Sequence, residues 1–453
     1  MCLTLSKSGK TFPRSLTARC LQRRTTRSSR GESHNLVGTT IRLNKRKKEG
    51  EPFTNWLTRK IDPKLNLQFL DFECEGKAFA IIVIEQSYHK PVTFDGSEYV
   101  RLGENTKPLS SYPELARAIW MATGRRRFED AVALQSVSAN DLSTLLNIDT
   151  LYDLTQVEKP KSQEEITRKL CKAKLAKSNM QGGYDITNLG AILLANSIDD
   201  FPSIASKSIR VVKYSGRDKR KAEIEQEGKM GYAVGFSRLV KFIMGRLPKE
   251  EMYIDGVRRV LPIVPEIAIR EVVANALIHQ DFTVSGSSPI IDIYANRVEV
   301  TNPGNSLILP DRMLDDRRSR NERLASTMRD FHLCEERGGG LDKALFAIEL
   351  ASLPPLEFVP SEHSMTVVLY GPKPFGKMSR QEKIRACYQH CVLRFIQRDF
   401  MSNASLRERF RMSADDYQPV SDVISAAKQE RRIAPADPDQ GRKGAKYIPY
   451  WAA

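Results

Sequence analysis

Residues 269–281 read Ile-Arg-Glu-Val-Val-Ala-Asn-Ala-Leu-Ile-His-Gln-Asp, and their spacing predicts a helix with one unusual face. Glu271, Asn275 and His279 lie at i, i+4 and i+8, so they form one stripe along the helix. A carboxylate, a carboxamide and an imidazole among apolar neighbours are typical of a binding site, although a solvated polar face explains the spacing equally well. The rest of the surface is expected to pack against a sheet through Ile269, Val272, Val273, Ala276 and Leu277.

The composition is that of a soluble globular protein with several domains. The chain has 453 residues, of which 41% are hydrophobic and 28% charged. It has no apolar run long enough to span a membrane. The seven cysteines show no paired spacing, which favours a reducing compartment, and we expect a cytoplasmic protein. Cys387, His390 and Cys391 lie close together, but they lack a second ligand cluster and favour helix packing over a metal site.

The positive charge lies at the two ends of the chain. Residues 1–30 contribute +8 and residues 376–453 contribute +6 to the net charge of +16. The long middle, residues 31–375, therefore carries only +2. A contact with nucleic acid is expected first at the ends, and the middle has no overall bias towards such a partner.

The sequence divides into five segments by composition and periodicity. The first is an Arg- and Ser-rich start that is disordered, targeting-like or atypical. A β-rich segment with a short apolar run at 79–84 follows, and then a helical connection with a middle α/β segment. A glycine- and proline-rich break near 371–374 precedes the last segment. The predicted ranges are 1–30, 31–120, 121–255, 256–375 and 376–453.

Two glycine turns follow the opening helix. Strands at 289–294 and 297–301 form a predicted hairpin that ends in Thr301-Asn-Pro-Gly304. Gly338, Gly339 and Gly340 then precede a helix, where consecutive backbone N–H groups can bind phosphate without a side chain in the way. The Arg-rich segment 317–323 lies between the two turns and can neutralise phosphate charge.

The spacing Glu271-x-x-x-Asn275 resembles the N-box of the GHKL ATPases, which include gyrase, the heat-shock-90 chaperones and histidine kinases. The resemblance implies that Glu271 is the general base and that Asn275 is the Mg²⁺ ligand of a bound ATP. Asn302 stands where that superfamily has an adenine-binding Asp, with Gly304 after it. The remaining residues that the resemblance implies for cofactor binding are Arg320 and Asn321 in the lid and Gly338, Gly339 and Gly340 in the second glycine box.

A wider run of motifs resembles the Schlafen-type AlbA/ATP-binding proteins, a family of predicted transcriptional regulators. The run includes residues 186–191, 269–281, 301–304, 319–322 and 334–343, and the resemblance extends over 31–453. It implies an α/β (α+β) fold with a partial AlbA-like module at 31–120, a GHKL (Bergerat)-like α/β sandwich at 256–375 and a C-terminal winged helix-turn-helix. It implies at most a weak ATPase and leaves hydrolysis open.

The AlbA-like module lacks the acidic strand that its relatives have upstream. Some Schlafen relatives cut RNA with clustered carboxylates, and here Glu73 and Glu75 are the only nearby acids at alternating spacing. A solvated strand edge explains these two residues more simply than a nuclease site.

The last segment has the pattern of a winged helix-turn-helix. We expect helices at 379–398, 405–410 and 415–429, with Asn403 as an N-cap and residues 431–450 as the wing. Asp415 and Asp416 at the start of the third helix oppose contact with phosphate, and protein docking is the alternative role. DNA contacts are expected from Arg407, Arg409, Gln418, Ser421, Arg431, Arg432, Arg442, Lys443 and Lys446.

These patterns predict an ATP-binding and DNA-binding transcriptional regulator whose bound nucleotide changes its affinity for DNA. The predicted partners are DNA, through the C-terminal segment, and a second copy of the chain, and no contact with a membrane is expected. An alternative is a nucleic-acid-processing defence or toxin-type effector in which bound ATP is regulatory. A third alternative is a degenerate pocket that serves only as a scaffold.

Overall fold

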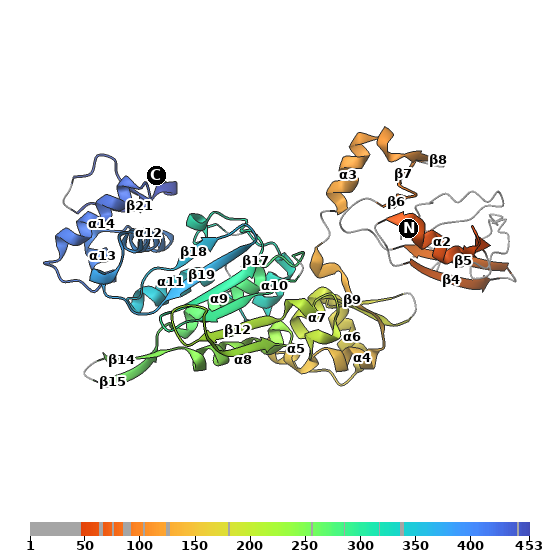
Figure 1. Cartoon of the computed structure of the whole chain (residues 1–453), viewed down its shortest axis with the longest axis horizontal. Helices are drawn as coiled ribbons and strands as arrows, with labels where there is room; N and C mark the ends of the chain where they lie inside the picture. The colour runs from red at the N-terminus through yellow and green to blue at the C-terminus, as the bar shows by residue number, and fades with distance from the viewer. Residues whose placement is uncertain are drawn as a thin grey trace. The chain divides into compact units, whose positions relative to one another are not determined.

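The computed structural model describes residues 47–453 apart from 63–66, 75–76, 85–91, 103–104, 124–126, 180–181, 255–256, 285, 317, 336–338 and 442–443. The predicted basic start at 1–30 lies outside the described residues. The chain divides into two compact units, Met1–Arg127 and Phe128–Ala453 (Figure 1). Helices and sheets alternate in both units, so the predicted mixed α/β class is confirmed. None of the described helices has the length and apolar character that a membrane crossing requires.

The first unit contains short strands and two described helices. Strands β3, β6, β7 and β8 form one antiparallel sheet, and β4 and β5 form a separate hairpin. The ring of Trp56 stacks on Phe53 at 5.6 Å and meets Phe94 edge-on at 5.8 Å, which fixes helix α2 beside the sheet. The bounds are β1 Lys47–Lys48, β2 Glu51–Pro52, α2 Phe53–Lys60, β3 Ile61–Asp62, β4 Leu67–Cys74, β5 Lys77–Ile84, β6 Thr93–Phe94, β7 Ser97–Leu102, β8 Asn105–Pro108 and α3 Pro113–Thr123.

A six-stranded sheet forms the centre of the second unit. Its order is β13-β12-β16-β17-β19-β18, and only β12 and β16 run parallel. The predicted hairpin is β16–β17, and alternate side chains of β17 are buried against helix α9. The bounds are β12 Ile209–Tyr214, β13 Ala222–Gly228, β16 Ile290–Ile293, β17 Arg297–Pro303, β18 Glu357–Pro360 and β19 Ser364–Tyr370.

Helices α9 (Glu266–His279) and α11 (Gly340–Leu350) pack together beside this sheet (Figure 1). Nine residues of α9 are buried, because the helix has apolar side chains on most of its circumference. Helix α10 (Glu322–Asp330) lies within the connection between β17 and α11. This helical layer on a sheet is the two-layer sandwich expected from the sequence.

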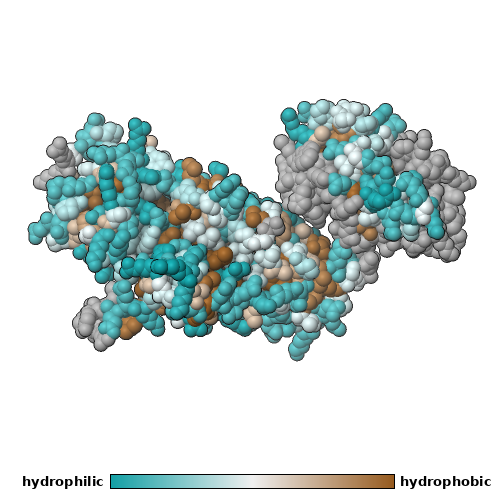
Figure 2. All heavy atoms as spheres, in the orientation of Figure 1, coloured by the Kyte–Doolittle hydropathy of each residue, from teal (hydrophilic) through white to brown (hydrophobic). Residues whose placement is uncertain are grey.

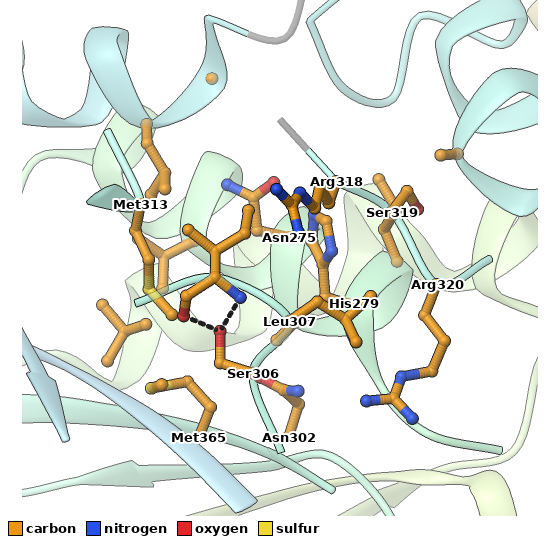
Figure 3. Close-up of a pocket in the computed structure, with 18 of the residues that line it drawn as sticks. Asn275, His279, Asn302, Ser306, Leu307, Met313, Arg318, Ser319, Arg320 and Met365 are labelled. Atoms are coloured by element: carbon orange, nitrogen blue, oxygen red, sulfur yellow. Dashed lines mark hydrogen bonds between the residues drawn. The ribbon is translucent and has the colours of Figure 1, made fainter. Parts of the chain in front are cut away.

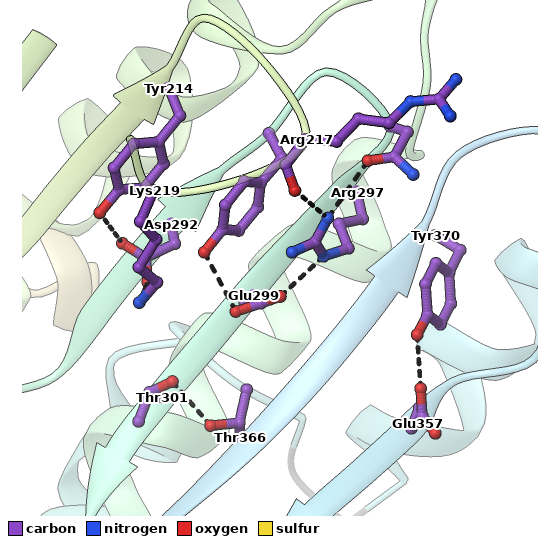
Figure 4. A network of polar contacts seen from close by, with 12 residues as sticks. Tyr214, Arg217, Lys219, Asp292, Arg297, Glu299, Thr301, Glu357, Thr366 and Tyr370 are labelled. Carbon is purple, nitrogen blue, oxygen red and sulfur yellow. Dashed lines mark hydrogen bonds and ion pairs between the residues drawn. The ribbon is translucent and has the colours of Figure 1, made fainter. Parts of the chain in front are cut away.

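The opposite face of the sheet carries a polar network (Figure 4). Asp292 is buried, and it accepts hydrogen bonds from Lys219 Nζ at 2.6 Å and from the Tyr214 hydroxyl at 3.3 Å. Glu299 accepts a bond of 2.7 Å from Arg297. These side chains alternate along the strands with the apolar ones that face the helices, so the sheet has one dry face and one polar face.

A smaller three-stranded sheet lies at the start of the second unit. Its order is β10-β11-β9, and helices α4, α6 and α7 pack against it. Helix α7 is entirely buried and approaches the backbone of Leu175 closely at Gly190. The bounds are β9 Val132–Val137, α4 Ala139–Leu145, α5 Ile148–Thr155, α6 Gln163–Lys172, β10 Ala176–Ser178, β11 Tyr184–Thr187, α7 Asn188–Leu194, α8 Tyr232–Arg246, β14 Lys249–Ile254 and β15 Val257–Pro262.

The C-terminal segment contains three helices and a two-stranded sheet. These are α12 Arg380–Ile396, α13 Asn403–Arg409, α14 Tyr417–Gln429, β20 Ile433–Pro435 and β21 Tyr447–Pro449. Ser402 caps α13, so the predicted N-cap at Asn403 is wrong by one residue. Cys387 and Cys391 are buried in α12, and His390 bonds to Glu349 and Ser405. The described part of the chain contains no group of His, Cys, Asp and Glu suited to a metal ion.

Hydrophilic side chains cover most of the visible face of the second unit, with hydrophobic side chains in patches between them (Figure 2).

Candidate nucleotide-binding site

A cavity of about 420 Å³ lies between α9, the end of β17, the segment 305–320 and the start of α11 (Figure 3). Its size is in the range of small-molecule sites. Polar groups from all four elements reach it, and apolar residues such as Leu307 and Met365 line the remainder.

The polar stripe of the opening helix lines this cavity. Glu271, Asn275 and His279 are all among the lining residues, so the structure brings them together in one site. Burial raises the pKa of Glu271. Burial also lowers the pKa of His279, helped by the charge of Arg320, which favours a neutral imidazole at pH 7. A carboxylate whose pKa is raised by burial accepts a proton more readily, as a general base must.

The start of α11 approaches this stripe because Gly340 has no side chain. A Cβ atom on Gly340 would lie 2.5 Å from Glu271 Oε2 and 3.9 Å from Asn275 Nδ2. Gly340 lines the cavity, and Gly339 is the residue before the first turn of the helix. The N-terminal end of α11 therefore borders the cavity, and the end of a helix with free N–H groups favours an anion. Gly338 lies outside the described residues.

The end of β17 forms the opposite side of the cavity. Asn302 is buried and lines it, and its Nδ2 donates only a long bond of 3.4 Å to the carbonyl of Pro303. Gly304 follows with φ of +98°, and a Cβ atom there would lie 2.4 Å from Asp281 Cβ. Gly304 therefore shapes the turn against α9 rather than lining the cavity.

The segment 305–320 covers the cavity, and Arg320 fixes its end. Arg320 pairs with Asp281 and donates to the carbonyl of Asn305 at 2.8 Å. Arg318 and Ser319 line the cavity, and the buried Ser319 hydroxyl has no hydrogen-bond partner among the described atoms. A bound phosphate would offer acceptors to both side chains.

Asn321 lies outside the cavity lining despite its predicted role in cofactor binding. Its Nδ2 donates to the carbonyls of Ile278 and Gln280, both at 2.8 Å, and so satisfies the end of α9. The structure therefore assigns it to positioning the helix that carries the polar stripe.

The lining of the cavity offers a carboxamide and hydroxyl groups that a magnesium–nucleotide complex would use. Mg²⁺ keeps several waters and takes few protein oxygens, so the Asn275 carboxamide with the phosphates satisfies its coordination. Asn275 lines the cavity, and the buried Ser319 hydroxyl beside it has no hydrogen-bond partner among the described residues, so both side chains are placed to contact such a group. When bound, the ion would neutralise phosphate charge.

Sequence reasoning missed several lining residues. Leu307, Met313, Met365 and Cys334 come from different elements and have no spacing that would group them. Burial raises the pKa of the Cys334 thiol to about 11. His279 also lines the cavity, although the sequence interpretation assigns it only to packing or to a cap near Asp281.

The predicted DNA contacts of the C-terminal segment have different surroundings in the structure. Gln418, Arg431 and Lys446 are exposed, whereas Arg407 and Ser421 are half-buried and hydrogen-bonded to Asn403. Arg432 pairs with Asp311 of the segment that covers the cavity. Arg442 and Lys443 lie outside the described residues.

The structure contradicts the prediction for Arg409. Its side chain is 1% exposed, donates to the carbonyl of Leu353 at 2.7 Å and faces Glu349. A guanidinium enclosed in this way cannot contact a phosphate of DNA. The sequence does not reveal this burial, because the spacing of Arg407 and Arg409 does not show which face of their helix packs against the rest of the protein.

Two family models match parts of the chain. Residues 31–110 match the one described as Schlafen, AlbA_2, and residues 286–369 match the one described as "Putative ATP-dependent DNA helicase recG C-terminal". The chain thus combines an AlbA-like domain with an ATPase-like domain, and these domains support nucleotide binding and interaction with nucleic acid. The second match contains Asn302 and the start of α11 and begins after α9.

Among solved structures, the chain is similar to the DIP2311 protein from Corynebacterium diphtheriae, a Northeast Structural Genomics Consortium target. The two are 16% identical, with a TM-score of 0.46, over 87% of this chain and 78% of that one. No curated protein matches the chain.

Proposed function

We propose that the protein is a transcriptional regulator that binds ATP with Mg²⁺ in the cavity beside α9 and binds DNA through its C-terminal segment. Asn275 would hold the ion, Asn302 would contact the base, and Arg318, Ser319 and the start of α11 would contact the phosphates. Glu271 lies where it could orient a water molecule for hydrolysis. The observation that carries the proposal is the convergence of these groups on one cavity.

The segment that covers the cavity also supports coupling between the two sites. Ser306, Leu307 and Met313 of this segment line the cavity. Asp311 of the same segment pairs with Arg432 and accepts a hydrogen bond from the Tyr388 hydroxyl through its carbonyl. A nucleotide that moves this segment would therefore change the surroundings of Arg432.

The C-terminal segment supports the DNA-binding part of the proposal through its order of elements. A helix is followed by two more helices and a hairpin, and Met401 between α12 and α13 forms a bridge to Tyr447 of the hairpin. This order matches a winged helix-turn-helix, in which α14 would enter the major groove. Homodimerisation stays a prediction from the sequence.

We expect Asn275→Ala to weaken binding of Mg²⁺-ATP by at least about tenfold, because the ion would lose its protein ligand. A titration with a fluorescent ATP analogue, with and without Mg²⁺, measures this change. Asn140→Ala serves as the control, because Asn140 is an exposed helical asparagine outside the cavity. Equal affinity in the wild type and Asn275→Ala, or no binding by either, would reject the nucleotide site.

We expect Asp311→Asn to raise the affinity for duplex DNA in the absence of nucleotide by about two- to fivefold. Asp311 and Arg432 are both partly exposed, so the pair between them contributes at most about 1 kcal/mol. Its loss releases Arg432 for a phosphate, and added ATP should then change DNA affinity less than in the wild type. Fluorescence anisotropy at fixed salt gives both quantities.

Asp315→Asn is the matched control for this coupling. It removes a carboxylate that pairs with Arg312 inside the same segment, rather than with Arg432 of the C-terminal segment. If Asp315→Asn changes DNA affinity as much as Asp311→Asn does, the Asp311–Arg432 pair is not the coupling contact.

A further inference from the structure

A second arrangement of three helices and a hairpin lies in the middle of the chain. Helices α4, α5 and α6 are followed directly by the antiparallel strands β10 and β11. Helix α6 packs against α4 and β10, and β9 completes the sheet on the other edge of β11. The C-terminal segment has the same order of three helices and a hairpin in α12, α13, α14, β20 and β21.

Hydrogen bonds at the described ends of the β10–β11 connection hold the hairpin together. Asn179 N donates to the carbonyl of Gly183 at 2.9 Å, and Gly183 N donates to Asn179 Oδ1 at 2.9 Å. Gly182 within the loop has φ of +83°, a conformation that glycine adopts without strain. The hairpin follows α6 directly and β10 packs against α6, which is the order of a third helix and a wing.

Positive charge is concentrated on the third helix and the strand that follows it. Between Glu165 and Asp185 the sequence has five basic residues and no acidic one. Four of them, Arg168, Lys172, Lys174 and Lys177, are exposed, and we call these four the basic edge. The fifth, Lys169, lies over the ring of Tyr152 at 4.3 Å and belongs to the packing of the module.

Packing of α6 fixes the direction of the basic edge. Ile166 and Leu170 of α6 are buried in the core, so Arg168 and Lys172 lie on the outer side of the helix. Arg168 is only 3.9 Å from Glu165 in a pair whose side chains are 77% and 52% exposed, which leaves its guanidinium accessible. Such an exposed pair contributes little to stability and does not compete strongly with a phosphate.

Two acidic residues limit how this surface can meet DNA. Glu164 and Glu165 are exposed in the first turn of α6. There they stabilise the helix through its dipole, and they repel phosphate. The cations lie instead towards the end of α6 and along β10. The geometry favours contact with the sugar-phosphate backbone at this end and does not favour base reading by the first turn.

We propose that the basic edge is a second DNA-contact surface, which binds the backbone of duplex DNA independently of the C-terminal segment. A helix beside a wing-like hairpin fits the groove and flanking strand of a duplex. Contacts of this kind carry no sequence information and make affinity strongly dependent on salt.

The test uses the full chain with Lys172→Glu and Lys174→Glu combined, measured by anisotropy on a labelled duplex over a series of salt concentrations. Affinity at about 0.1 M salt should fall by about tenfold, and the slope of log K against log salt should decrease in magnitude by about two. The control is Lys221→Glu combined with Lys241→Glu, which makes the same change of charge at exposed positions elsewhere. Lys221 lies just before β13, and Lys241 lies in α8. A thermal melt checks that each variant is folded, and Lys172→Ala with Lys174→Ala gives the loss of contacts without reversed charge.

A third pair, Arg431→Glu with Lys446→Glu, separates this inference from the proposed function of the C-terminal segment. If only that pair weakens binding, the middle surface is rejected and the C-terminal proposal stands. If only the substitutions at Lys172 and Lys174 weaken binding, the middle surface stands and the C-terminal proposal fails. An effect at Lys172 and Lys174 no larger than at Lys221 and Lys241, or a wild type that does not bind the duplex, also rejects the inference.

Discussion

Arg409→Ala should lower the free energy of unfolding of the C-terminal segment by about 3–5 kcal/mol, because it removes one partner from a buried charged group. Arg409 is almost completely enclosed, with Glu349 Oε1 3.7 Å from its Nε. The Glu349 side chain is 11% exposed, and after the substitution His390, at 2.9 Å, would remain as its partner. The carbonyl of Leu353 would lose its 2.7 Å hydrogen bond as well.

The measurement is urea unfolding followed by the fluorescence of Trp451. The chain has three tryptophans, so Trp56 and Trp120 are first replaced by phenylalanine to leave a single reporter. Arg411→Ala is the matched control, because Arg411 donates to the carbonyl of Leu350 at 3.0 Å from an exposed position. We expect that control to change stability by no more than about 1 kcal/mol. A similar small effect of Arg409→Ala would contradict its structural role.

Gly190→Ala should destabilise the second unit by at least about 3 kcal/mol, because a methyl group at this position has no space. Its Cβ would lie 2.1 Å from the carbonyl oxygen of Leu175 and 2.9 Å from the carbonyl carbon. That oxygen also accepts hydrogen bonds from Thr187 N at 3.1 Å and Thr187 Oγ1 at 2.9 Å. Backbone must therefore move, and α7 would separate from the turn between α6 and β10.

Gly245→Ala provides the opposite expectation within the same unit. Gly245 lies in α8 and is exposed, and no atom lies within 4 Å of the position that a Cβ atom would take there. Alanine is preferred over glycine in a helix, so this variant should be more stable by about 0.5–1 kcal/mol. Thermal unfolding followed by circular dichroism compares the two variants. Equal melting temperatures would show that α7 tolerates the added methyl group.

The helix at the start of the site could be predicted closely from the sequence. The apolar spacing and the stripe of Glu271, Asn275 and His279 depend only on the 3.6-residue period, and α9 places all three in one cavity. Gly340 could be assigned to the same site by its order in the chain. The reason that this position must be glycine is its close approach to Glu271. That approach depends on how two helices pack that lie more than sixty residues apart in the chain, and the sequence does not specify it.

Charge was predicted less well, because a sum over a long segment hides its distribution. The span 31–375 is nearly neutral, yet it contains the basic edge on α6 and β10. Conversely, Arg409 counts as part of a basic tail in the sequence and is buried in the fold. Whether a charged side chain meets solvent depends on which side of its helix packs, and a net charge does not contain that information.

The sequence by itself determined the mixed α/β class, the polar stripe of α9 and the glycine turns, since each follows from local spacing and backbone preference. The tertiary structure alone decided that Asn321 holds the end of α9, that Asp311 meets Arg432 and that Arg409 is enclosed. These three contacts join residues 41 to 121 positions apart. Such contacts depend on how completed helices and strands pack, and local patterns do not specify that packing.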